Sequence, residues 1–542
     1  GIKNYYRTYN VYENRENYEL LANYNKQIAD FKIDVNAGSD IYNRSYKDNG
    51  GNTVDGLSIP DLYNITNSVS APSVFNTRIN EQYRALFAKA TFSYKNFLFV
   101  DGTVRNDWFS SLFPKDNSVL AKSFGGSFVF SELLPQFNNW LSFGKIRVSY
   151  GETPQALATA NDNYGAYRNN TVYGVNQYKF GTNILMNTPD QSVDPALHGA
   201  VFKQTEAGLD LRFLNDRLGL SATYYQGTDV DFPASVTVNP ASGFSSILTN
   251  FGKIQRKGIE LTLSGTPVRI SNFNWDVTIN GARQLQNKVI EVSKKYGVTR
   301  YINPEDHVWG NDMPYMVFQE GKEWGQIYGN GIKRNAAGVP IIAANGMYAN
   351  DPNVYFGSVL PKWTGGIQNS FTIFKSFVVN ANIDYQVGGK FVSLSNRWGQ
   401  YSGLTSVTAA LNDKGVPVRD PVEDGGGVKV SGVDDSGKPV SNYIDAKTYF
   451  QGLTNNKTYD SYIYDLTFVK LREVSIGYKI PVAKLGLGKV IQSARFDITG
   501  RNLLLIYAKS KDYDPSEISS QQGESGQLPG TRGIGFNLKV TF

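Results

Sequence analysis

Residues that could do catalytic chemistry are few and far apart in this sequence. The chain of 542 residues has no Cys and 2 His, which argues against a thiolate metal site and against a His-rich zinc or iron site. Nothing in the spacing places a nucleophile beside His198 or His307. The segment Gly486-Leu487-Gly488 lacks the third glycine of a dinucleotide-binding loop. We therefore expect no catalytic residue, no cofactor-binding residue and no enzyme activity.

A small acidic cluster near the end of the chain is the best candidate for metal binding. Asp512, Asp514 and Glu517 supply carboxylate oxygens, which are ligands that calcium prefers. The twelve-residue spacing of an EF-hand is absent, however. A solvated loop or a partner-facing surface is the favoured interpretation. No metal is therefore predicted, and calcium is kept as a secondary expectation at these three residues.

Aromatic side chains in polar segments are better candidates for a binding function. Aromatic residues make up 13% of the chain. Sugar rings can stack their apolar C–H faces on such side chains, and peptides can use the same surfaces. The candidates for contact with a substrate or partner are Tyr164, Tyr167, Tyr173, Tyr178, Trp309, Trp324, Tyr328, Trp398, Tyr401, Tyr443 and Tyr449. Packing of the loops against each other or against a partner is the alternative role for each of them.

The elements that carry these residues are predicted to be β-strands. Apolar and polar residues alternate from Phe377 to Gln386 and again from Gly533 to Phe542, with the period of two that is typical of a strand with one apolar face. Charged residues such as Arg495 and Asp497 occupy the other face, which suits a wet lumen. No apolar run approaches the ~20 residues that a membrane-spanning helix needs. An all-β chain is therefore expected.

The connections alternate between short links and long polar loops, which is the organisation of an outer-membrane β-barrel. We predict one partial barrel domain over residues 1–542, with about fifteen antiparallel strands of ~10 residues each. The extracellular loops are expected at about 106–120, 151–200, 227–251, 285–361, 387–465 and 507–530. Because antiparallel barrels of bacteria have even strand numbers, further strands are expected upstream of this chain.

The charge distribution argues against one class of partner. The net charge is +6, and the basic residues are dispersed along the chain, whereas a nucleic-acid binder would concentrate them. No nucleic-acid partner is therefore predicted. The first residues, Gly1-Ile2-Lys3-Asn4, have none of the features of a signal peptide, so we expect a piece of a longer chain.

Six segments in a fixed order carry a family resemblance. They are Lys145–Thr153, Asn250–Leu261, Phe273–Val289, Pro361–Gly366, Thr499–Pro515 and Leu528–Phe542. Together they resemble the SusC/RagA family of TonB-dependent outer-membrane transporters. Arg256 departs from the family pattern, which often has Asn there.

The resemblance implies the C-terminal part of a 22-stranded transmembrane β-barrel in the bacterial outer membrane, in contact with lipid and lipopolysaccharide. It implies TonB-dependent import of an oligosaccharide or oligopeptide ligand together with a SusD-like surface lipoprotein. The plug, the TonB-contacting segment and the signal peptide are expected to lie outside this chain, so TonB would act through the missing N-terminal part. Two alternatives stay open. One is a non-transporting barrel subunit that scaffolds an outer-membrane assembly, and the other is a secreted β-rich adhesin or polysaccharide-active protein.

Overall fold

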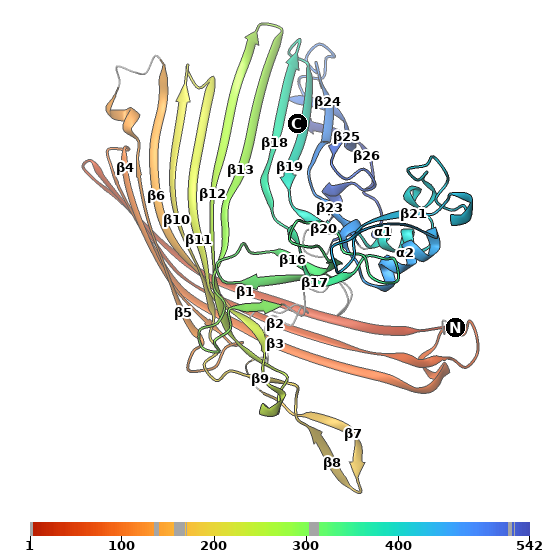
Figure 1. Ribbon diagram of the computed structural model, residues 1–542. Helices are drawn as coiled ribbons and strands as arrows, with labels where there is room; N and C mark the ends of the chain where they lie inside the picture. The colour runs from red at the N-terminus through yellow and green to blue at the C-terminus, as the bar shows by residue number, and fades with distance from the viewer. Residues whose placement is uncertain are drawn as a thin grey trace. The chain divides into compact units, whose positions relative to one another are not determined.

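The computed structural model describes residues 4–134, 140–156, 169, 171–302, 314–518, 523–524 and 526–542. The main element is a sheet of sixteen strands, fifteen of which follow one another in hydrogen-bonded order (Figure 1). These fifteen are β1 (Arg7–Ile28), β2 (Phe31–Leu57), β3 (Ser68–Tyr94), β4 (Leu98–Phe109), β5 (Ser118–Phe128), β6 (Leu141–Gln155), β10 (Ala200–Phe213), β11 (Leu218–Thr237), β12 (Ser246–Ile270), β13 (Phe273–Glu291), β18 (Pro361–Ile373), β19 (Phe377–Gly388), β24 (Phe468–Ile480), β25 (Ser493–Ala508) and β26 (Gly533–Thr541). The sixteenth, β9 (Gln191–Val193), pairs in parallel with the start of β12.

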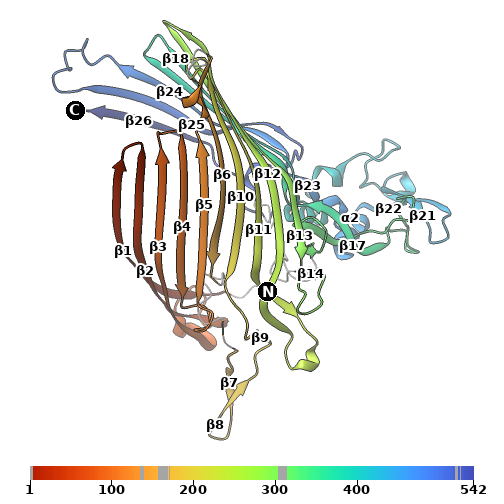
Figure 2. The ribbon, with the colours of Figure 1, turned by 90° about the vertical axis from the view of Figure 1, so that its left-hand side faces the viewer.

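The chain forms two compact units. Unit 1 comprises residues 1–133, 146–207 and 227–253, and unit 2 comprises residues 134–145, 208–226 and 254–542. In unit 1, strands β1 to β5 lie side by side and are joined by antiparallel pairing (Figure 2). The two-residue turn between β1 and β2 contains Ala29, and the short turn between β3 and β4 contains Asn96. Both residues have a left-handed backbone conformation, as tight hairpins require.

The register of unit 1 separates an apolar face from a polar face. Phe92 on β3 pairs with Val100 on β4, and both belong to the apolar face. The next row on the other face contains Asp34, Thr91 and Asp101. Such alternation along every strand is what a wall between lipid and a wet lumen needs.

Unit 2 shows the same separation in its own strands. Ile476, Ile498 and Phe536 lie opposite one another across β24, β25 and β26 and form an apolar row. In the neighbouring row, Asp497 is buried on the polar face and binds Arg495 at 2.6 Å. The alternation predicted for this part of the sequence is therefore confirmed.

Aromatic side chains gather where short links join the strands of unit 2. The rings of Phe377 and Tyr478 lie 4.9 Å apart, and those of Trp275 and Phe371 lie 5.9 Å apart in a stacked arrangement. Amphipathic rings of this kind favour the interface between the hydrocarbon and the polar region of a membrane. The short-link end of the strands thus has the composition expected of an interfacial girdle.

The long connections of unit 2 contain folded elements of their own. One small sheet is formed by β14 (Arg300–Ile302), β15 (Tyr315–Gln319), β16 (Gln326–Ile332) and β17 (Asn350–Ser358), and two strand pairs are formed by β20 (Lys390–Val392) with β23 (Ile463–Asp465) and by β21 (Val428–Val433) with β22 (Pro439–Ile444). Helices α1 (Leu394–Tyr401) and α2 (Ala446–Asn455) contact each other beside them (Figure 1). The side chains of Ser393 and Asp445 cap the N-termini of the two helices. A buried cluster of Val392, Leu394, Tyr459 and Tyr462 gives this part of the loops its own core.

The prediction of about fifteen strands is confirmed, but the predicted strand lengths and several loop boundaries are wrong. Strands β2 and β3 each have 27 residues, and the expected loop at 227–251 is mostly strand, because β11 continues to Thr237 and β12 begins at Ser246. Likewise β4 and β5 extend into the loop expected at 106–120. Backbone pairing continues into segments whose side chains no longer alternate between apolar and polar, so side-chain periodicity underestimates strand length. No helix in the described ranges is long and apolar enough to cross a membrane.

Candidate functional site

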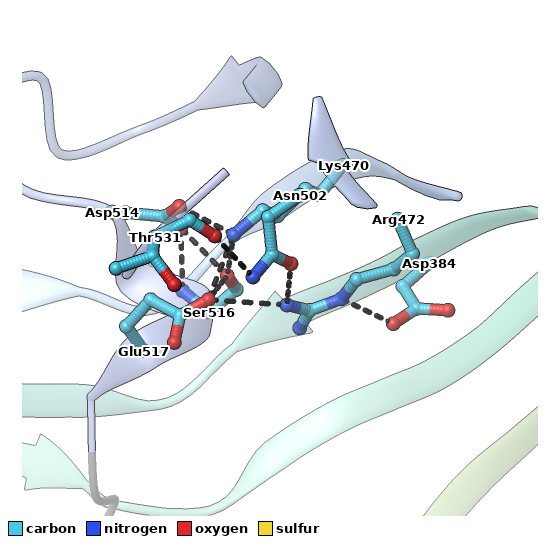
Figure 3. Close-up of polar contacts among 8 residues, drawn as sticks. All are labelled: Asp384, Lys470, Arg472, Asn502, Asp514, Ser516, Glu517 and Thr531. Carbon is cyan, nitrogen blue, oxygen red and sulfur yellow. Dashed lines mark hydrogen bonds and ion pairs between the residues drawn. The ribbon is translucent and has the colours of Figure 1, made fainter. Parts of the chain in front are cut away.

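A buried lysine on β24 fastens the last long loop to the polar face of the sheet in unit 2 (Figure 3). The side chain of Lys470 is 3% exposed. Its Nζ atom lies 2.7 Å from Oδ2 of Asp514 and 2.8 Å from Oε1 of Glu517, and it also donates to Oγ of Ser516 at 3.0 Å. A buried cation of this kind is stable only when it is paired and hydrogen-bonded, and here three acceptors meet that need.

The local sequence of the loop prepares these acceptors. Asp514 caps a short 3-10 turn, Pro515–Glu517, in which proline takes the first position. The Oδ1 atom of Asp514 accepts bonds from the backbone N–H and the hydroxyl of Ser516 at 3.0 and 2.7 Å. The other carboxylate oxygen therefore stays available for Lys470, and the turn places Glu517 beside it.

A β-bulge extends the network to a second cation. Asn502 and Leu503 on β25 lie opposite Arg472 on β24, and Asn502 has a left-handed φ of 53°. Nε of Arg472 lies 2.7 Å from Oδ2 of Asp384, and its Nη1 lies 3.2 Å from Oε1 of Glu517. The bulge thus directs Arg472 between the strand wall and the loop, while Asn502 donates to the carbonyl of Thr531 at 3.1 Å (Figure 3).

Asp514 and Glu517, the two loop carboxylates of this network, are held in their ionised form. Burial opposes ionisation of Asp514, but hydrogen bonds from Lys470 and Ser516 outweigh it and lower the pKa of that carboxyl. The hydrogen bond from Lys470 likewise lowers the pKa of Glu517. The network therefore consists of charged partners at neutral pH.

The same geometry bears on the calcium expectation at Asp512, Asp514 and Glu517. Asp514 and Glu517 already bind Lys470, and Asp512 accepts a long hydrogen bond of 3.4 Å from Asn396 instead. Among the residues that the structure describes, no group of three or more potential ligands is arranged to hold a metal ion. Calcium binding here stays a prediction without support from the geometry.

A second attachment joins the same loop to helix α1. Glu524 is 4% exposed, and its carboxylate accepts hydrogen bonds from the hydroxyls of Ser393 and Ser395 at 2.8 and 2.6 Å. The backbone N–H of Ser395 adds a third bond at 3.0 Å. Burial opposes ionisation of Glu524, but these hydrogen bonds outweigh it and lower the pKa of the carboxyl. The negative charge at the N-terminus of α1 is also favourable to the helix dipole.

The aromatic candidates fall into three groups. Tyr164, Tyr167 and Trp309 lie outside the described residues. Three more pack within the loops of unit 2, which agrees with the alternative role of loop packing. These three are Trp324, against the cluster of Met316, Ile327 and Val359; Tyr328, whose ring lies 5.4 Å from that of Tyr355; and Tyr449, whose burial raises the pKa of its hydroxyl.

The third group has accessible rings. Tyr173 and Tyr178 are exposed in unit 1. In unit 2, Trp398 is exposed and meets Tyr401 edge to face at 5.8 Å. The hydroxyl of Tyr443 donates to Asp413 at 2.6 Å, which fixes that ring in place. The structure thus brings Trp398 and Tyr401 together and leaves the remaining accessible rings separate.

Tyr401 also lines a cavity of about 390 Å³ in the loops of unit 2. Its other lining residues include Phe450, Arg419 and Lys447. The guanidinium of Arg419 donates to the carbonyls of Gly403 and Thr408 at 2.5 and 2.7 Å, and no carboxylate in the described part of the chain pairs with it. Asp445 also lines the cavity, so two cationic side chains and one carboxylate line it together with the two aromatic rings. Through Arg419, such a cavity suits a carboxylate-bearing ligand such as an acidic sugar or a peptide end.

A second cavity, of about 400 Å³, lies on the polar face of unit 1 and was missed by the sequence reasoning. The rings of Tyr42 and Tyr83 stack at 5.4 Å on its wall. Beside them, Arg105 binds both oxygens of Asp107, which is 4% exposed, at 2.7 to 2.9 Å. Oδ1 of Asp40 is buried there without a hydrogen-bond partner among the described residues.

This arrangement combines an aromatic surface with fixed polar groups, which is suited to a sugar or a peptide backbone. The alternation of polar and apolar residues along the strands could have indicated this site. Asp40 and Tyr42 occupy polar positions of β2, and Arg105 and Asp107 occupy polar positions of β4. The binding residues predicted from the sequence all lie in loops, and these strand residues are not among them.

Comparisons with known proteins agree with this architecture. Residues 2–413 match the family model described as TonB dependent receptor-like, beta-barrel. The chain is 25% identical over 495 residues to TonB-dependent receptor P26 of Formosa agariphila, covering 85% of this chain and 46% of that protein. It is 28% identical over 202 residues to TonB-dependent receptor SusC of Bacteroides thetaiotaomicron, covering 36% of this chain and 19% of that protein.

Solved structures of the RagAB peptide transporter share the fold. One of them has a TM-score of 0.73 and 20% sequence identity, covering 99% of this chain and 56% of the other. The chain thus spans about half the length of the similar transporter chain, and less than half of the curated relatives.

Proposed function

The chain belongs to the TonB-dependent receptor-like β-barrel family, and we propose that it forms the substrate-facing barrel part of an importer for oligosaccharides or oligopeptides. The protein is located in the outer membrane of a bacterial cell, and its family is one of receptors and transporters rather than enzymes. The observation that carries the proposal is the attachment of a folded loop to the polar face of the sheet through buried Lys470. A solute path needs a polar wall and ordered loops that can control access to it.

The proposed ligand class follows from the two cavities and from the relatives. Stacked Tyr42 and Tyr83 beside Arg105 in unit 1 suit sugar rings and hydroxyls. Arg419 in unit 2 suits a carboxylate, as found at a peptide C-terminus or in an acidic sugar. The resemblance to the RagAB peptide transporter supports peptides, and the stacked Tyr42 and Tyr83 support oligosaccharides as the other class.

The proposed partners are a SusD-like surface lipoprotein above the loops, and TonB acting through a part of the protein outside this chain. Exposed apolar side chains on the loops of unit 2, such as Trp398, Leu404 and Leu411, support a covering protein. Lipid and lipopolysaccharide would contact the apolar face of the strands.

Uptake measurements on whole cells test this proposal. Cells that lack the gene should lose uptake of one class, either a labelled oligosaccharide or a labelled oligopeptide, and uptake in wild-type cells should stop when TonB is removed. Complementation with the full-length gene should restore both properties. Unchanged uptake of every oligosaccharide and oligopeptide tried would favour the scaffold alternative instead.

A further inference from the structure

A two-stranded hairpin in unit 1 projects away from the rest of the sheet. It consists of β7 (Gly174–Phe180) and β8 (Asn183–Asn187), which pair only with each other within the described residues. Figures 1 and 2 both show the hairpin extending beyond the ends of the neighbouring strands of unit 1. It lies in the connection between β6 and β10, at the long-loop end of the strands.

The hairpin is unusually apolar for an element that no other strand of the described residues pairs with. Six large side chains are 63% to 75% exposed: Tyr173, Val175, Tyr178, Phe180, Ile184 and Met186. Lys179 is the one charged residue from 172 to 187. Exposed apolar clusters of this kind mark interaction surfaces.

Both faces of the hairpin are apolar. Val175 pairs with Met186 and Ile184 pairs with Lys179, so Ile184 and Met186 share one face, while Phe180 lies on the other. An isolated two-stranded hairpin is marginally stable in water, and one with two apolar faces gains most by insertion between two surfaces. A groove in a partner, rather than a flat surface, fits this shape.

We propose that residues 173–187 form a docking arm that inserts into an apolar groove of the surface lipoprotein, and this inference rests on the proposed function. A lipid partner is disfavoured because the outer edges of the two strands carry N–H and C=O groups that hydrocarbon cannot satisfy. A second copy of the chain is disfavoured because copies in one membrane share an orientation and meet side by side, whereas the arm extends past the strand ends. The position of the hairpin beyond the strand ends therefore favours the lipoprotein above the loops as its binding partner.

Paired charge substitutions test the arm in the full-length protein, expressed with its lipoprotein in native outer membranes. Phe180→Glu with Ile184→Glu should reduce the lipoprotein recovered with the tagged barrel by about tenfold, as expected for central apolar anchors of an interface. The matched control, Ala241→Glu with Ser242→Glu, adds the same charge at exposed positions of the turn Pro240–Ser242 in unit 1, outside the arm, and should leave recovery unchanged. Heat-modifiable gel mobility establishes that both variants have assembled barrels.

A photoreactive phenylalanine derivative in place of Tyr178 identifies the occupant directly. A crosslink to the lipoprotein supports the proposal. A crosslink to a second copy of the chain, a crosslink to lipid alone, or recovery equal in both paired variants would overturn the docking arm while leaving the proposed function intact. Failure to recover any lipoprotein with the wild-type barrel would contradict the proposed partner itself, and the docking arm with it.

Discussion

Lys470 on β24 and Asp514 in the last long loop are 44 positions apart in the chain, and Nζ of the lysine lies 2.7 Å from Oδ2 of the aspartate. The same nitrogen binds Glu517 at 2.8 Å. One buried cation therefore holds a loop against the polar face of the strands, and Glu524 fastens a later part of that loop to helix α1. Because Lys470 and Glu524 are buried, loss of either side chain should release this loop from the wall or from helix α1.

Lys470→Met should loosen the loop, because it leaves the carboxylates of Asp514 and Glu517 without their shared cation. The cost should stay below the about 3–5 kcal/mol of a fully buried pair, because both carboxylates are 30% exposed and Glu517 keeps its contact with Arg472. Limited proteolysis of the detergent-solubilised protein should show new cleavage within residues 509–531. Arg501→Met is the matched control, because Arg501 on the adjacent strand is 73% exposed and its pair with Glu473 contributes at most about 1 kcal/mol. Equal cleavage of the two variants would contradict the role given to Lys470.

Acid should weaken the loops of unit 2 through Asp465. Burial opposes ionisation of this residue, but hydrogen bonds from Thr467, Lys509 and Lys390 outweigh it and lower its pKa from the ordinary 3.8 to about 2. A lowered pKa in the folded state means that the stabilisation is complete above pH 3.8 and is lost as the pH falls toward 2. Cleavage of residues 387–465 by pepsin, which is active at acid pH, should increase as the pH falls through that window. Asp465→Asn should remove this dependence, and an unchanged profile would argue against it.

A charge on the apolar face of β25 should impair assembly. Ile498 is 45% exposed between Ile476 and Phe536, so Ile498→Arg places a cation against lipid at a cost of about 2–4 kcal/mol near the midplane. The neighbouring Thr499 lies on the polar face, opposite Ser475, and Thr499→Arg serves as the control. The yield of heat-modifiable barrel in outer-membrane fractions compares the two. Similar yields would show that the lipid-facing and lumen-facing side chains of β25 are assigned incorrectly.

Arg419→Gln should reduce uptake of ligands that carry a carboxylate. A hydrogen bond to a charged group contributes about 1.5–3 kcal/mol, which corresponds to a loss of roughly tenfold or more in apparent affinity. Neutral ligands of similar size should be affected much less. Arg334→Gln changes an exposed arginine elsewhere in the loops and is the control. If acidic and neutral ligands lose affinity equally, Arg419 has a structural role only.

The accessible and buried aromatic residues show how far loop composition can predict a site. Loop composition predicts Trp398 and Tyr401 as contact surfaces, and the two rings lie together, with Tyr401 on a cavity wall. It predicts Trp324 and Tyr449 on the same grounds, but these two pack inside the loops. Composition does not distinguish the two cases, because burial of a loop side chain depends on neighbours that are distant in the sequence.

Side-chain alternation in the sequence is enough to predict an all-β chain and to assign which side chains of a strand share a face. Alternation is a local property: neighbouring residues such as Asp497 and Ile498 must point to opposite sides of the sheet whatever the rest of the chain does. The meeting of distant side chains, such as Lys470 with Asp514 or Tyr42 with Tyr83, is visible only in the folded chain. These contacts depend on strand register, on the bulge at Asn502 and on the path by which a loop returns to the wall, and each of these is fixed by pairing between segments that are far apart in the chain.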